Sequence, residues 1–326
     1  MRTRFPLLIA ALCALALAPS PAPAQASPSP WPQRIVKLIV PLSPGSAADV
    51  TARLYGERLA ARWGKPVVIE NRPGPDAMVA VSSFVSGRDD HTLLFSFGGP
   101  ITINPVLHER LPYDPERDLT PIVSASDSFI AIAVTEALGI GSMDELVRRA
   151  KAEPGKLNWA ATAGLPQFAF AGFQKNAGLE MTQVSYRDFT PAFQDLSEGR
   201  ISLAATGVVT LLPLARAGKI RLLLVNNRTR SLAAPQVPTA REAGYPELAV
   251  DGFQGFFGWR DMPQELRARI AADVRAAGED PALAERLSAI GQAVRTGTTD
   301  DFIAMIEEQR AKIAAIARVI GLKPQP

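Results

Sequence analysis

The residue types that most often carry catalysis are scarce in this chain. Its 326 residues include two histidines, His91 and His108, and one cysteine, Cys13. A Ser-His-Asp hydrolase needs a histidine beside its nucleophile, and the G-x-S-x-G turn that presents such a serine is absent. A glycine-rich phosphate loop ending in lysine is absent as well. The sequence therefore argues against an enzyme, and we expect no cofactor.

The residues Asp89-Asp90-His91 are the only cluster that resembles a set of metal ligands. They are consecutive, they precede an apolar run, and no partner at metal-ligand spacing accompanies them. Zinc sites in proteins take three or four ligands arranged around the ion, which favours residues from separate turns or strands. A solvated turn is the simpler interpretation, and we expect no metal site. His108, beside Glu109 and Arg110, is expected at the surface.

The stretch from Ile35 to Trp63 has a pattern suited to holding an anion. A short apolar, β-branched run leads into the loop Pro44-Gly45-Ser46-Ala47, and helical spacing resumes at Asp49. A helix that begins after a buried strand points unpaired N–H groups and the positive end of its dipole at such a loop. The pattern indicates a loop that holds a carboxylate. The alternative is an ordinary strand-to-helix turn in which Asp49 is a first-turn acid.

The rest of the chain alternates short apolar runs with segments of helical spacing. Strands are expected at 35–40, 67–70, 92–97, 129–134, 157–161, 182–186, 201–206, 220–225 and 253–259. Helices are expected at 49–63, 78–85, 142–152, 167–177, 190–197 and 208–217, then from 263, from 281 and over 299–319. This alternation predicts an α/β fold with parallel sheets, whose ligand-binding loops gather at the strands' carboxyl ends. The segment 111–121, rich in proline and charge, is expected to be a surface connection.

The first residues are typical of an export signal. Arg2 and Arg4 precede an apolar run that is too short to span a bilayer, and Ala24-Gln25-Ala26 fits the small-x-small cleavage rule. We expect cleavage near Ala26, export to the periplasm and no membrane span. The formal net charge of +3 falls to +1 without the two arginines, since 33 basic residues then face 32 acidic ones. This balance argues against a nucleic-acid partner.

Several stretches of the chain resemble the Bug receptors, the substrate-binding proteins of tripartite tricarboxylate transport systems that are expanded in Bordetella and its relatives. The most distinctive are ENRPG at 70–74 and LPYD at 111–114, and further matches are spread over almost the whole chain. The resemblance implies a type II periplasmic binding protein, or Venus flytrap, in which each domain is a mainly parallel sheet flanked by helices. It implies a first domain of residues 31–126 plus 252–326 and an inserted second domain, 127–251, after a signal peptide at 1–26.

The resemblance also implies that loops after strands of both domains hold the ligand. The matching positions here are Pro44, Gly45, Ser46, Ala47, Phe97, Gly98, Thr162, Gly164, Gln167, Phe168, Tyr186, Arg187 and Thr206. The implied function is a monomeric periplasmic receptor that captures a small carboxylate and delivers it to membrane transporter subunits without catalysis. A receptor whose ligand-bound form is detected by a membrane sensor kinase is the alternative.

The chain departs from the family pattern within these loops. Ser46 stands where a second glycine is usual, and the loop after residue 162 has few hydroxyls but contains Phe168 and Phe170. Burying an unpaired polar group costs on the order of 1–3 kcal/mol, so these changes favour a less polar ligand. We predict a monocarboxylate with an aromatic or apolar body, packed by Phe97, Phe168 and Phe170 and held at its carboxylate by the first loop. The alternative is that these phenylalanines are core residues.

Overall fold

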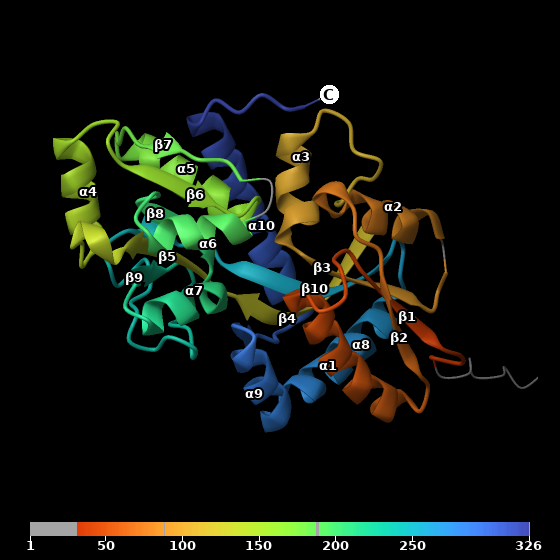
Figure 1. The fold of residues 1–326 in the computed structure, drawn as a ribbon. Coiled ribbons are helices and arrows are strands. Elements are labelled where there is room, and N and C mark those ends of the chain that lie inside the picture. The colour runs from red at the N-terminus through yellow and green to blue at the C-terminus, as the bar shows by residue number, and fades with distance from the viewer. Residues whose placement is uncertain (1–30, 88, 187–188, 326) are drawn as a thin grey trace, which may run out of the picture.

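The computed structural model describes residues 31–325 except Arg88, Arg187 and Asp188. The expected signal peptide with its cleavage site near Ala26, and the candidate ligand residue Arg187, therefore lie outside the described residues. Figure 1 shows two sheets, each flanked by helices. The two-domain α/β prediction is confirmed. None of the helices in the described part of the chain is both long and apolar enough to cross a bilayer.

The first sheet has six strands in the order β11-β4-β10-β3-β1-β2 and joins the two ends of the chain. Its strands are β1 (Val36–Val40), β2 (Val67–Asn71), β3 (Thr92–Phe97), β4 (Leu119–Ser128), β10 (Gly252–Trp259) and β11 (Gln292–Val294). β1 pairs in parallel with β2 and β3, while β10 runs antiparallel to β3 and β4. The core includes Tyr55, Phe95 and Phe256, whose rings pack edge to face with centroids 5.1 and 5.8 Å apart.

Helices from both ends of the chain cover this sheet. They are α1 (Ala47–Trp63), α2 (Met78–Gly87), α3 (Asn104–Leu107), α8 (Gln264–Gly278), α9 (Pro281–Ala289) and α10 (Thr299–Val319). A short π-helical turn, η2 (Gly99–Ile103), links the end of β3 to α3. α1 begins at Ala47, two residues before the predicted start. The reason is local, because the Ser46 hydroxyl accepts a hydrogen bond from the Asp49 backbone at 3.3 Å and so serves as the N-cap.

The second sheet has five strands in the order β7-β6-β8-β5-β9. Its strands are β5 (Ile130–Thr135), β6 (Asn158–Ala161), β7 (Thr182–Gln183), β8 (Leu203–Gly207) and β9 (Ile220–Val225). Its helices are α4 (Met143–Ala152), α5 (Leu165–Asn176), α6 (Thr190–Ser197) and α7 (Val208–Arg216). Trp159 of β6 packs against Phe170 of α5 with ring centroids 4.9 Å apart, and Phe170 in turn packs against Phe173.

Each sheet is mixed, yet its strands are mainly parallel, as predicted: four of the six strands in the first sheet and four of the five in the second run in one direction. The local pattern misplaced or missed some of the strands. β4 begins at Leu119 within the expected surface connection, and β11 has no counterpart among the expected strands. In the second sheet β5 is antiparallel to both β8 and β9. β7 has two residues where 182–186 was expected, because it pairs with β6 only at Asn158 and Trp159.

The long helix α10 contacts helices of both sheets. In Figure 1 it runs between α5 and α3. A Cβ added at Gly172 of α5 would lie 2.9 Å from Ile316 Cγ2, so the two helices cross in close contact. Ile103, Phe168 and Ile313 form a small apolar cluster at this junction. α10 is therefore placed to connect both parts of the molecule.

Candidate functional site

A cavity of about 190 Å³ lies between the two sheets and is lined by residues of both. The end of β3, the start of α5 and the two chain crossovers meet there. Its lining residues are Phe97, Gly98, Gly99, Ile103, Ser128, Ile130, Ala163, Gly164, Leu165, Pro166, Gly252, Phe253 and Gln309. Most of these side chains are apolar, and polar side chains are contributed by Ser128 and Gln309. The size is below the roughly 300–1,000 Å³ of drug-sized sites and suits a small metabolite.

The N-terminus of α5 forms part of the cavity wall. Gly164 is its N-cap with φ +88°, a left-handed conformation that favours glycine, and no side chain caps the helix. Pro166 has no N–H, so Leu165 and Gln167 carry first-turn N–H groups that find no acceptor within the helix. These donors and the positive end of a 12-residue helix favour an anion at this point. The wall thus combines an anion-binding end with apolar sides.

The loop before α1 is already engaged with its own helix. The Gly45 N–H donates to Asp49 Oδ2 at 2.8 Å, and the Ser46 N–H donates to the Ser43 carbonyl at 3.2 Å. Burial raises the pKa of Asp49, but hydrogen bonds from Arg53, Gly45 and Asn71 outweigh it and lower the pKa below its usual value. Asp49 therefore holds this loop as an ionised carboxylate. The donors left to a ligand are the Ala47 and Ala48 N–H groups of the first helical turn.

The predicted site residues fall into two groups. Phe97, Gly98 and Gly164 line the cavity. The other described ones lie outside its lining, namely Pro44, Gly45, Ser46, Ala47, Thr162, Gln167, Phe168, Tyr186 and Thr206. Phe168 belongs to the apolar cluster with Ile103 beside the cavity.

Three of these aromatic and polar side chains are committed elsewhere. Phe170 is fully buried among Trp159 and Phe173, which favours the core alternative for this one residue. Thr206 is buried within β8. The Tyr186 hydroxyl donates to Asp195 Oδ2, and burial together with this carboxylate raises the pKa of Tyr186 to about 12.

Gln309 of α10 is a cavity residue that sequence reasoning missed. It is 4% exposed, and both atoms of its amide are hydrogen-bonded. One signal was present: Gln309 continues the apolar spacing of Phe302, Ile306 and Ile313 along one helix face. A polar residue on such a face faces the core and needs partners.

A network of charges, with its two carboxylates buried, lies at the two crossovers between the sheets. Arg295 Nη1 is 3.0 Å from Asp127 Oδ1 and 3.1 Å from Asp251 Oδ2, and Arg228 Nε is 2.8 Å from Asp251 Oδ2. Burial outweighs the attraction of Arg295 and raises the pKa of Asp127 to about 6. The carboxylates outweigh burial for Arg295 and raise its pKa. The network ties the crossovers to residues of both sheets.

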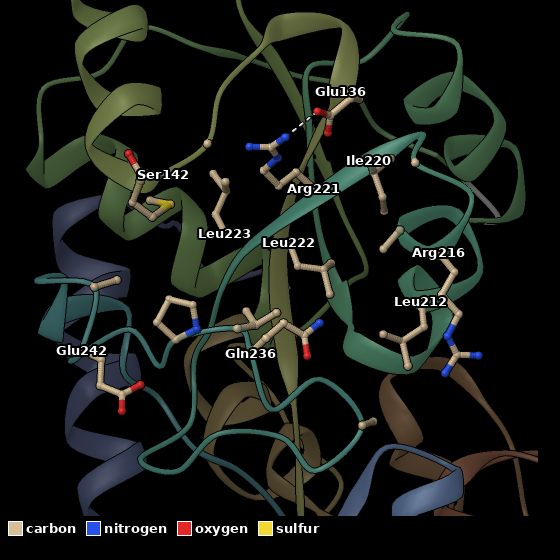
Figure 2. A pocket seen from close by; sticks show the side chains of 18 of the residues that line it. Glu136, Ser142, Leu212, Arg216, Ile220, Arg221, Leu222, Leu223, Gln236 and Glu242 are labelled. Atoms are coloured by element: carbon tan, nitrogen blue, oxygen red, sulfur yellow. Dashed lines mark hydrogen bonds and ion pairs between the residues drawn. The ribbon is translucent and has the colours of Figure 1, made fainter.

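A larger hollow of about 1020 Å³ lies away from the crossovers, beside the edge strand β9 (Figure 2). Its lining residues all come from 136–243, so it does not lie between the sheets. Two of its charged side chains pair with each other, as Arg221 Nη2 is 2.6 Å from Glu136 Oε1. The nearby N-terminus of α4 is capped by its own Ser142 and Glu145. We therefore place the candidate ligand site in the smaller cavity between the sheets.

The Asp89-Asp90-His91 cluster is satisfied by protein groups. Arg34 Nη2 lies 2.6 Å from Asp89 and 2.8 Å from Asp90, and it holds the pKa of Asp89 well below its usual value. His91 Nδ1 is 2.8 Å from Asp90 Oδ1, while Nε2 accepts the Gln33 N–H at 3.0 Å. His91 is 4% exposed, so the expected solvated turn is instead a buried one at this residue.

Comparison with known proteins agrees with this architecture. Residues 51–322 match the family model described as the tripartite tricarboxylate transporter family receptor. A UPF0065 protein of Bordetella bronchiseptica is 30% identical over 295 residues, which cover 90% of this chain and 88% of that protein. The solved structure of R. palustris Rpa4515 with adipate is 28% identical, with a TM-score of 0.77, covering 91% of this chain and all of that one. MatC from Rhodopseudomonas palustris with bound malate is 26% identical, with a TM-score of 0.70 and coverage of 89% and 100%.

Proposed function

The chain belongs to the tripartite tricarboxylate transporter receptor family, and we propose that it captures a small carboxylate with a largely apolar body between its two sheets. It is a periplasmic solute-binding receptor of this family, which delivers its ligand to a membrane transporter. The observation that carries the proposal is the cavity of about 190 Å³, where an uncapped helix N-terminus meets apolar walls.

The carboxylate would lie at the N-terminus of α5. Leu165 and Gln167 supply N–H donors there, and the helix dipole adds a favourable charge interaction. The first-turn N–H groups of α1 lie outside the lining of this cavity, so we do not assign them to the ligand. A carboxylate at the N-terminus of α5 exchanges its water for fixed donors, which a neutral ligand group does less well.

The body of the ligand would pack against Phe97, Ile130, Leu165 and Phe253. These side chains offer no hydrogen bonds, so a methylene chain or an aromatic ring matches them better than a row of hydroxyls. Adipate, the ligand of one similar structure, has four methylene groups between its carboxylates. Malate, the ligand of another, is shorter and carries a hydroxyl. We propose that this chain prefers acids whose body is apolar, such as adipate or an aromatic monocarboxylate, over acids that carry hydroxyls.

We further propose a monomer in which residues 31–126 plus 252–326 form one domain and 127–251 the other. Sheet membership supports this division, because the strands of each sheet fall almost entirely within those ranges. Arg2, Arg4 and the small residues around Ala26 support a cleaved export signal.

Native mass spectrometry of the protein purified from its own periplasm, without refolding, is the first test. A retained small carboxylate would name the ligand, because slow dissociation keeps tight ligands bound through purification. Calorimetric titration with adipate, benzoate, malate and citrate would follow. We expect adipate or benzoate to bind more tightly than malate and citrate. Binding of citrate alone would refute the apolar-ligand proposal.

A matched pair of variants locates the site. Leu165→Ser changes the wall of the cavity between the sheets, whereas Leu222→Ser changes a half-buried leucine in the hollow beside β9. We expect the first to weaken binding of the retained acid and the second to leave it unchanged. The reverse result would move the site to the outer hollow.

A further inference from the structure

We propose that Gln309 is a positioning residue that couples the ligand cavity to the chain crossover at 249–251. That the cavity binds the ligand rests on the proposed function. The connection between the cavity and the crossover rests on the hydrogen bonds of Gln309. Filling the cavity would, through this one side chain, change how the two sheets sit relative to each other.

The amide of Gln309 bridges two segments that are far apart in the sequence. Its Nε2 donates to the Asp251 carbonyl oxygen at 2.6 Å, and its Oε1 accepts from the Thr102 hydroxyl, also at 2.6 Å. The orientation of the amide is fixed by these partners, because a carbonyl needs a donor and the reversed amide would set two oxygens face to face. With the side chain buried, neither bond has water as a ready replacement.

The cavity side of this bridge is in direct contact with the wall. A Cβ added at Gly98 would lie 2.2 Å from Gln309 Oε1, so the backbone at Gly98 runs against the amide. The Thr102 hydroxyl also lies 2.9 Å from the Gly98 carbonyl oxygen. Gly98 and Gln309 both line the cavity, so a ligand that shifts the backbone at 98–102 shifts the amide with it.

The crossover side is held at several points by the same helix. One turn after Gln309, Lys312 Nζ donates to the Ala249 carbonyl at 2.7 Å. The Asp251 carboxylate accepts the Arg228 backbone N–H at 3.0 Å, and Arg228 comes three residues after the end of β9 in the second sheet. Asp251 thus accepts two hydrogen bonds. Its backbone carbonyl accepts one from Gln309, and its carboxylate accepts one from the chain that leaves the second sheet.

Hydrogen–deuterium exchange tests the connection without any ligand. Gln309→Met keeps the length of the side chain and removes both bonds. Thr102→Val removes the cavity-side bond, and Lys312→Met, the matched control on α10, removes a crossover bond outside the cavity. We expect Gln309→Met to speed exchange about tenfold in peptides covering both 97–104 and 249–254, the effect of losing one buried hydrogen bond at each. Lys312→Met should speed exchange only in 249–254.

A double variant separates positioning from general loosening. If Thr102 acts through Gln309, adding Thr102→Val to Gln309→Met speeds exchange in 97–104 by less than Thr102→Val does alone, because the shared bond is already gone and only the Thr102 contact with the Gly98 carbonyl remains to be lost. Full additivity of the two changes would overturn the proposal. So would Gln309→Met acting on only one of the two segments, or Lys312→Met acting on both.

A distance measurement between two labels tests the effect of the ligand. The chain from Trp31 onward contains no cysteine, so labels can be attached at Val68→Cys and Leu232→Cys. These two residues are 46% and 69% exposed and belong to different domains. Adipate is expected to narrow the distance distribution between the labels in the wild type. In Gln309→Met we expect about tenfold weaker adipate binding and no narrowing at saturation. Narrowing that persists in the variant would refute the coupling. If the wild type binds none of the acids, the proposed function fails while the exchange experiment still decides the connection.

Discussion

Replacing Asp127 by asparagine should stabilise this protein at pH 8, although it removes one member of an ion pair. Asp127 is 8% exposed, and its partner Arg295 also serves Asp251. Burial disfavours the charged carboxylate by more than Arg295 favours it, which raises the pKa of Asp127 to about 6. Asparagine keeps an oxygen that can accept from Arg295 and carries no charge to bury.

The size of the effect follows from the pKa. The difference between about 6 in the folded protein and the ordinary 3.8 corresponds to about 3 kcal/mol, at 1.36 kcal/mol per pKa unit. The folded state binds this proton more tightly than the unfolded state does. The stability that the protonated Asp127 contributes is therefore full below pH 3.8 and is lost as the pH rises through about 6.

Urea unfolding followed by tryptophan fluorescence measures this difference. Asp127→Asn should match the wild type near pH 4 and exceed it by up to about 3 kcal/mol at pH 8. Comparing the two proteins at each pH cancels the contributions of distant groups. An asparagine variant that is less stable than the wild type at pH 8, with a gap that closes as the pH falls towards 4, would show that the charged pair stabilises the fold, and would refute the reasoning.

Asp118 provides a control of opposite sign. A hydrogen bond from Arg117 lowers the pKa of Asp118 to about 2. The stability that its carboxylate contributes is therefore present above pH 3.8 and is lost as the pH falls towards 2. Asp118→Asn should accordingly be less stable than the wild type at pH 8, with a gap that closes in acid.

Three further predictions concern single contacts. Tyr55→Phe should lower the free energy of unfolding by about 1–2 kcal/mol in urea, because the fully buried Tyr55 hydroxyl donates to the Ala125 carbonyl at 2.7 Å. Ser46→Ala should cost about 1 kcal/mol in the same assay through loss of the α1 N-cap, and Ser46→Gly less. Gly98→Ala should lower the melting temperature and weaken adipate binding in calorimetry, since its Cβ would meet Gln309 Oε1 at 2.2 Å; unchanged binding would show that this wall moves freely.

Much of the fold followed from local pattern. The predicted segments 92–97, 190–197, 220–225 and 299–319 coincide with β3, α6, β9 and α10. Short apolar runs bounded by proline, glycine or charge are strong local signals, and so is a long helix with a capping box at Thr298.

β4 was missed because its signal is not local. Its residues, LTPIVSASDS, contain Pro121 and small polar residues, yet most are buried. They form a strand because β10 and β11 pair with them from distant parts of the chain. The mixed character of the first sheet follows from that pairing and is invisible to periodicity in one segment.

The candidate site was predicted only in part for the same reason. Loops after strands pointed to Phe97, Gly98 and Gly164, which do line the cavity. Gln309 and Phe253 lie on a helix and a strand of the first domain that follow the whole second domain in the sequence, more than a hundred residues after β4. Loops after strands in one segment give no sign of them. Whether a loop's N–H groups are free is also a tertiary property, because the Gly45 N–H is taken by Asp49.

The selectivity of such a receptor depends on which of its polar groups are already hydrogen-bonded to other protein groups. Asp49, Gln309 and Asp251 are all hydrogen-bonded within the protein, to a loop, a cavity wall and a crossover. In the proposed site, the ligand would meet a helix end and a set of apolar side chains. A hydroxyl placed against Leu165 or Phe253 would lose water without gaining a partner, at about 1–3 kcal/mol or roughly 5- to 150-fold in affinity. A methylene at the same place would gain about 0.8 kcal/mol by burial. In the proposed site, the walls, more than the carboxylate end that every such acid shares, would therefore decide which acid is carried.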